Sequence, residues 1–141
     1  MPPDNLSSFL PEELVGEDSF MARPHRHLEV DKVNDVFCAR MRERRLDETG
    51  IHEFTEELLS LIEDQGCRKL VLSLGPGSPE CLYSIFVAKL YSVRKRISEL
   101  GGRMKLCDVT ADVVEVFEAV HLKEFFDFVP DREAAVAALA T

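Results

Sequence analysis

The sequence predicts one α/β domain, in which a mixed sheet of about five strands is packed by about four helices. Short apolar runs alternate with longer segments whose apolar residues recur at helical spacing, and turn or cap residues separate the two kinds of segment. The length of 141 residues suits a single domain with its own core. The expected order of elements is β-β-α-β-α-β-α-β-α.

The segment from 69 to 102 is the centre of this prediction. Residues 69–74, KLVLSL, form a nearly continuous apolar run, which is typical of a central strand covered on both faces. A loop rich in Gly, Pro and Ser follows, and an apolar stripe over residues 85–100 then predicts a helix that Gly101 and Gly102 end. Open α/β sheets usually carry their working residues in loops at the carboxyl ends of strands, and Ser84 has that position.

Two strands are expected before the first helix. Residues 26–33 and 36–42 alternate apolar with polar side chains on either side of Asn34 and Asp35, which predicts a hairpin at the sheet edge. Residues 1–24 are rich in Pro, Ser, Asp and Glu. We expect them to form a mobile or loosely docked arm, and residues 25–141 to form the domain.

The other helices begin at typical cap residues. Asp47 or Thr49 is expected to cap the first helix, Thr110 the third and Asp131 the last. Between them, residues 103–109 and 125–129 are predicted to be strands. The repeated β-α-β steps imply parallel strands joined by right-handed crossovers.

Charge and composition limit the kinds of partner. The net charge is −9 with a pI near 4.9, which weighs against nucleic acid, and the arginines at 40, 42, 44 and 45 are interpreted as a solvated face balanced by nearby acids. No window approaches the ~18 apolar residues of a membrane span, so no membrane partner is expected. The four cysteines show no C-x-x-C spacing and indicate reduced thiols in a cytoplasmic protein. Another protein is the expected partner.

The sequence shows no constellation typical of catalysis. His25 and His27 could form a metal-binding H-x-H pair, but no third ligand is identifiable, so surface histidines are the favoured interpretation. Residues 75–77 lack the pattern of a phosphate-binding loop. We therefore predict no catalytic residue, no metal site and no cofactor, and a protein that is not an enzyme.

Ser84 has two interpretations. A serine where a loop becomes a helix is most often an N-cap, and that is the default. A phosphate on Ser84 would instead lie at the positive end of the helix dipole, where the fold could accommodate it while the surface charge changed sharply. Tyr83 beside it could be a core anchor or an exposed contact.

Several blocks together resemble the STAS domain, the anti-sigma-factor antagonist family. They are the helix entry RRLDETGIHEF, the strand KLVLSL, the helix start SIFVAKL and the C-terminal block GGRMKLCDVTADVVEVFEAVHLKEFFDFVPDREAAVAAL. The resemblance covers nearly everything from Leu28 to the C-terminus and implies a single STAS-type domain.

The resemblance implies a regulatory module in a partner switch. Such an antagonist binds an anti-sigma factor that is also a serine kinase, and phosphorylation of a serine at the start of the second helix breaks the complex. On this chain the phosphoacceptor falls on Ser84. The partner-binding surface is expected to comprise Ser78, Glu80, Leu82, Tyr83 and Ser84.

Two alternatives remain open at the level of sequence. Tyr83 stands where switching members usually carry Asp or Ser, and the loop 75–82 is longer and contains two prolines. These departures leave open the alternative of a non-switching STAS scaffold or sensor subunit, which would bind itself or other STAS proteins. A small ligand-binding domain or enzyme that uses the loop 75–82 is the alternative from another class.

Overall fold

The computed structural model describes residues 26–140, apart from residues 76 and 82. The expected N-terminal arm, His25 and Leu82 lie outside the described residues. The described elements are β1 (Leu28–Val33), β2 (Val36–Met41), α2 (Glu48–Glu63), β3 (Lys69–Ser73), α3 (Tyr83–Glu99), β4 (Arg103–Cys107), α4 (Ala111–Ala119), the 3-10 turn η2 (Lys123–Phe125), β5 (Asp127–Val129) and α5 (Arg132–Leu139). The predicted order β-β-α-β-α-β-α-β-α is confirmed, with one additional 3-10 turn.

The five strands form one sheet in chain order. β1 and β2 pair antiparallel around the turn at Asn34, whereas β2, β3, β4 and β5 run parallel to one another. The predicted edge hairpin and the predicted mixed sheet are therefore both confirmed. The parallel strands bring the loops after β2, β3 and β4 to the same edge of the sheet.

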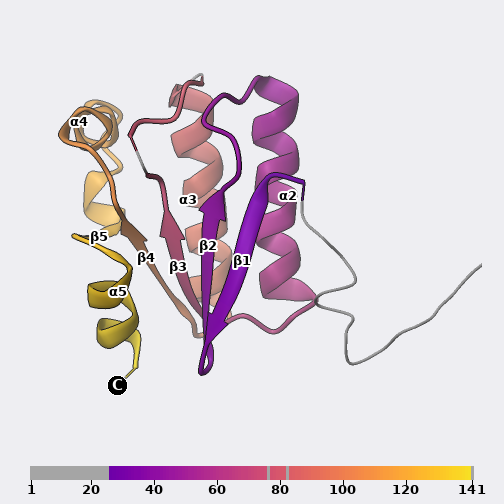
Figure 1. Ribbon diagram of the computed structural model, residues 1–141. Helices are drawn as coiled ribbons and strands as arrows, with labels where there is room; N and C mark the ends of the chain where they lie inside the picture. The colour runs from indigo at the N-terminus through magenta and orange to yellow at the C-terminus, as the bar shows by residue number, and fades with distance from the viewer. Residues whose placement is uncertain (1–25, 76, 82, 141) are drawn as a thin grey trace, which may run out of the picture.

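Helices cover both faces of this sheet. In Figure 1, α2 and α3 lie behind the sheet and α5 lies in front of it, toward the β4–β5 side. Alternate side chains of β3 serve the two layers: Leu70 and Leu72 join the core under α2 and α3, and Val71 joins a smaller cluster with Ala135 and Leu139 of α5. β3 is thus the doubly covered central strand that its apolar run predicts.

Side-chain caps fix where the helices begin. Asp47, rather than Thr49, caps α2, because its carboxylate accepts a hydrogen bond from the Gly50 amide at 2.7 Å. Thr110 caps α4, and Asp131 caps α5. Among the described residues, no helix combines the length and the apolar character needed to cross a membrane.

The last strand is shorter than expected. Phe125 and Phe126 do not extend it, because their amides donate to the carbonyls of Leu122 and Lys123 and close the turn η2. The turn directs the ring of Phe126 into the core, where its centroid lies 5.0 Å from that of Phe117. Burial of the Phe117–Phe126 ring pair therefore stabilises the chain more than extending the strand by two residues would.

Candidate functional site

The loop from β3 to α3 passes close to the end of β4. The Leu74 amide donates to the Cys107 carbonyl at 3.1 Å, and Gly75 is buried against Asp108. A Cβ at position 75 would lie 2.8 Å from the Cβ of Asp108, which is closer than such atoms approach. Glycine is required at position 75 because the backbone of the β3–α3 loop contacts the side chain of Asp108 in the β4–α4 connection.

Residues 44–46, which precede α2, hold the far end of the loop. The Glu80 amide donates to the Arg44 carbonyl, and the Leu46 amide donates to the Glu80 carbonyl at 2.9 Å. The Arg45 guanidinium also lies 3.2 Å from the Glu80 carboxylate, in an ion pair that is exposed to solvent. The backbone bonds fix the loop, since exposed ion pairs contribute little.

A second attachment joins the loop to α4. The hydroxyls of Ser78 and Thr110 lie 2.8 Å apart and share a hydrogen bond, and Thr110 is the N-cap of α4. The same loop thus contacts the segments that begin α2 and α4. Its described residues are held by two parts of the chain that are distant in sequence, residues 44–46 and residues 107–110.

Tyr83 anchors the first turn of α3. Its ring is half-buried against the main core, and its hydroxyl donates to the Pro79 carbonyl. Burial raises the pKa of the Tyr83 phenol, so the hydroxyl keeps its proton at neutral pH. Tyr83 is therefore a core anchor with one exposed side, which combines the two interpretations that the sequence left open.

Ser84 is the second residue of α3 and is exposed. The interpretation of Ser84 as the N-cap is therefore wrong, because the cap position precedes Tyr83 and lies outside the described residues. The first turn of α3 contains no acidic residue. An anionic group on Ser84 would lie beside the free amides and positive dipole of this helix end.

The structure brings four of the five predicted binding residues to one edge of the domain, and the fifth, Leu82, lies outside the described residues. Glu80 and Ser84 are exposed there, while Ser78 and Tyr83 are half-buried beneath them. Beside Ser84, a groove of about 340 Å³ runs between the starts of α2 and α3. The sequence analysis did not predict the residues that line this groove. The sequence shows only that they belong to the first turns of two helices. They are Glu48, Thr49, His52, Ile85 and Lys89.

The remaining candidate groups have structural partners. His27 lies 2.9 Å from the Glu53 carboxylate and joins the start of β1 to α2. Within the described ranges, no group of three His, Cys, Asp or Glu side chains is placed to hold a metal ion.

The cysteines are poor nucleophiles. All four are free thiols, as the sequence predicts. Burial raises the pKa of Cys67 and of Cys107 to about 12, and that of Cys81 to about 11. Since the thiolate is the reactive form, these thiols are unsuited to covalent catalysis at neutral pH.

Known proteins share this arrangement of elements. No protein-family model matches the chain. A Bordetella bronchiseptica protein, BtrV, which carries the name of an anti-sigma factor antagonist, is 28% identical over 114 residues, or 81% of this chain and 95% of its own. A solved anti-sigma-factor antagonist (STAS) domain protein from Planctomyces limnophilus is 25% identical, covers 81% of this chain and 98% of its own, and superposes with a TM-score of 0.69.

The chain is similar to anti-sigma-factor antagonists with the STAS fold. The resemblance found in the sequence is thereby confirmed, as is the fold. The same STAS fold is present in the Bacillus cell fate determinant SpoIIAA, solved in its phosphorylated form, at a TM-score of 0.60 and 13% identity over 79% of this chain and 98% of SpoIIAA. In this chain, the described residues of the loop 75–82 and the start of α3 form the edge described above.

Proposed function

We propose that this STAS domain is the antagonist in a cytoplasmic partner switch. It binds an anti-sigma factor that is also a serine kinase, and phosphorylation of Ser84 by that kinase ends the binding. The kinase supplies the chemistry, and the STAS domain has no catalytic step of its own.

The observation that carries the proposal is the position of Ser84. Ser84 is exposed in the first turn of α3 and follows a loop whose described residues are held by residues 44–46 and 107–110. An enzyme can reach such a hydroxyl without unfolding the domain. Because the described loop residues are already held in place, a partner that binds them loses little conformational freedom.

Electrostatics supports the direction of the switch. A phosphate at Ser84 adds a charge of about −1.5 to −2 at the positive end of a helix, so the fold tolerates it. The same charge in the centre of a protein interface loses its hydration and opposes association. Phosphorylation would thus change partner binding far more than stability.

The relatives agree with this proposal. BtrV is named for antagonism of an anti-sigma factor, and SpoIIAA is described in a phosphorylated form. Both statements concern those proteins. They support the same kind of partner and the same kind of modification for this chain.

Capture from native cells tests the proposed partner. We expect the immobilised full chain to retain a protein with an ATP-binding serine-kinase domain, and a Glu80→Lys variant to retain much less of it. Glu118→Lys is the matched control, because Glu80 and Glu118 are both 56% exposed and both pair with one cation, but Glu118 lies on α4. Equal capture by both variants would contradict the proposed surface, and capture of this chain alone would favour a self-associating scaffold.

A further inference from the structure

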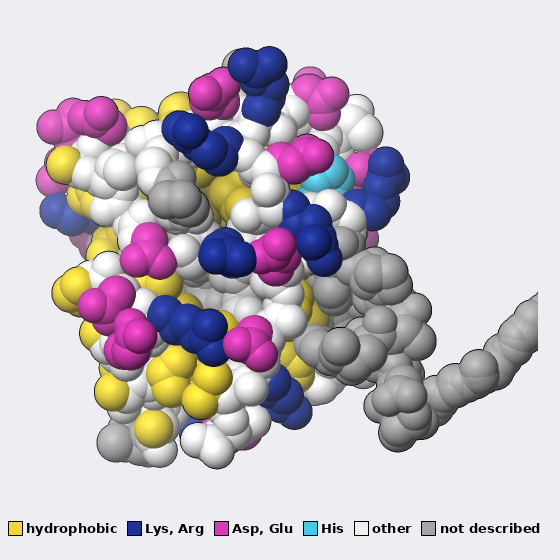
Figure 2. Space-filling view, viewed as in Figure 1, with side chains coloured by type: hydrophobic (Ala, Val, Ile, Leu, Met, Phe, Trp, Pro, Cys, Tyr) yellow, Lys and Arg dark blue, Asp and Glu magenta, His cyan; other side chains and the backbone are white. Residues whose placement is uncertain are grey.

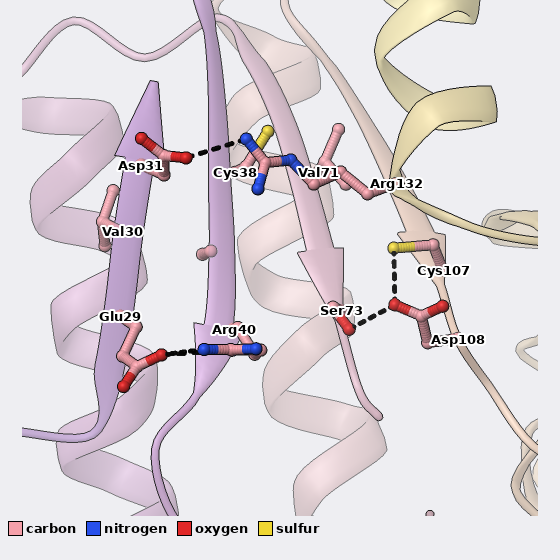
Figure 3. Close-up of a pocket in the computed structure, with 11 residues that line it drawn as sticks. Glu29, Val30, Asp31, Cys38, Arg40, Val71, Ser73, Cys107, Asp108 and Arg132 are labelled. Carbon is pink, nitrogen blue, oxygen red and sulfur yellow. Dashed lines mark hydrogen bonds and ion pairs between the residues drawn. The ribbon is translucent and has the colours of Figure 1, made fainter. Parts of the chain in front are cut away.

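A hollow of about 400 Å³ lies on the face of the sheet that α5 covers only in part (Figure 3). Its floor includes Cys38 of β2 and Val71 of β3, and charged side chains surround this floor. Figure 2 shows acidic and basic side chains interspersed over the same face. The volume falls within the ~300–1,000 Å³ range of small-molecule sites.

Two guanidiniums from different elements lie over this floor. Arg40 uses Nε and Nη2 to bind the Glu29 carboxylate, and Arg132 uses Nη2 to bind Asp31 at 2.8 Å. Both acids belong to β1, and the pKa of each carboxyl group is lowered by its arginine. The ion pairs with β1 therefore fix the orientation of both guanidiniums.

Each arginine keeps hydrogen-bond donors for a ligand. A guanidinium carries five N–H donors, and within the described part of the chain no bond occupies Nη1 of Arg40. Arg132 extends from α5 toward Cys38, two residues before Arg40 on the same face of β2. The two guanidiniums are thus separated along the strand direction by roughly 7 Å. A small carboxylate can lie between them and accept hydrogen bonds from both.

An acceptor lies on the opposite wall. Oδ2 of Asp108 accepts from the Ser73 hydroxyl at 2.6 Å and lies 3.5 Å from the thiol of Cys107. These contacts leave the other carboxylate oxygen, Oδ1, for a ligand. Asp108 has a φ of +58°, in the left-handed region, and its side chain lines this wall.

The free hydrogen-bonding groups define the ligand. Glu29 and Asp31 already pair with Arg40 and Arg132, so what the lining still offers is spare guanidinium donors on one side and the Oδ1 acceptor of Asp108 on the other. A ligand that presents both a carboxylate and an ammonium would use both kinds of group. We propose that the hollow binds a small zwitterion, a free α-amino acid, with its carboxylate on Arg40 and Arg132 and its ammonium on Asp108.

This binding is independent of the proposed partner switch. The hollow nevertheless adjoins the switch loop, because the Gly75 amide lies 3.4 Å from the Ser73 hydroxyl and Gly75 packs against Asp108. A ligand here would contact residues that hold the loop before Ser84. Direct binding to the isolated chain tests the hollow even if the switch is absent.

Titration followed by ¹H–¹⁵N NMR tests the proposal. The full chain is titrated with each proteinogenic L-amino acid at millimolar concentration. We expect at least one to give saturable shifts centred on the amides of Cys38, Arg40, Ser73 and Asp108. Its analogues that lack either the amino group or the carboxylate should bind at least tenfold more weakly.

Two exposed substitutions examine the contacts separately. Arg40→Gln and Asp108→Asn should each weaken binding at least tenfold, and Asn tolerates the left-handed backbone at position 108. Lys123→Gln, on η2 and outside the hollow, should leave the affinity unchanged. The proposal is overturned if no amino acid shifts the hollow residues, or if both hollow variants keep full affinity.

Discussion

Replacing Ser84 by Glu is expected to lower the affinity of this domain for the proposed anti-sigma partner by a hundredfold or more. The hydroxyl is exposed in the first turn of α3, within the surface that we propose as the interface. A carboxylate there loses hydration when the partner covers it, and about 3 kcal/mol of disruption corresponds to more than a hundredfold in Kd. Isothermal titration calorimetry with the captured partner measures the change.

Two variants separate this effect from unfolding. Ser84→Ala should bind as the wild type does, because Ser84 is not the helix cap and removal of its hydroxyl breaks no bond within the described part of the domain. Ser92→Glu places the same charge on an exposed residue two turns further along α3 and should also bind normally. Undiminished affinity of Ser84→Glu, or an equal loss in Ser92→Glu, would count against the assigned interface.

Replacing Phe117 by Ala lowers the free energy of unfolding by about 3–5 kcal/mol. The ring is fully buried, and its centroid lies 5.0 Å from that of Phe126 and 5.2 Å from that of Phe128, edge-on to both. Truncation leaves a cavity between α4 and the last strand and removes both ring contacts. A loss of this size is a large part of the ~5–15 kcal/mol that stabilises an ordinary domain.

Urea denaturation measures the effect of Phe117→Ala. Phe125→Ala is the control, because Phe125 is only partly buried and, among the described residues, its ring contacts one other ring, that of Tyr91, at 5.3 Å. We expect the control to lose clearly less stability. Equal losses in the two variants would show that Phe117 is not the centre of this aromatic cluster.

The main elements could be predicted because their signals are local. The alternation around Asn34, the apolar run of β3 and the caps Asp47, Thr110 and Asp131 each act within a few residues of chain. Gly101 and Gly102, after α3, illustrate the difference between a local signal and a long-range contact. Gly101 has the expected positive φ of +83°, whereas Gly102 is needed because a Cβ there would lie 2.5 Å from the Arg68 carbonyl oxygen.

The candidate site was predicted less completely because its shape depends on long-range contacts. The sequence indicated Ser84 and the loop, but the bonds from Glu80 to Arg44 and from Ser78 to Thr110 join residues more than thirty positions apart. The arginines at 44 and 45 were interpreted as a solvated face, and both remain exposed while also supporting the loop. Pattern alone does not encode such pairings.

The hollow beside α5 had no signal in the sequence. Its residues come from four strands, the β4–α4 connection and one helix, and they meet because the sheet places β1, β2, β3 and β4 side by side. Alternation showed that Glu29 and Asp31 share a face of β1. Only the position of α5 shows that this face is partly enclosed.

The central claim is that Ser84 carries the regulatory phosphate. The most direct measurement is the intact mass of the protein recovered from its native cells in growth and under stress, with the modified peptide sequenced. We expect an added phosphate on Ser84 whose occupancy changes with conditions. A chain that carries no phosphate in any condition, or carries it on another residue, would contradict the switch and favour a non-switching STAS scaffold.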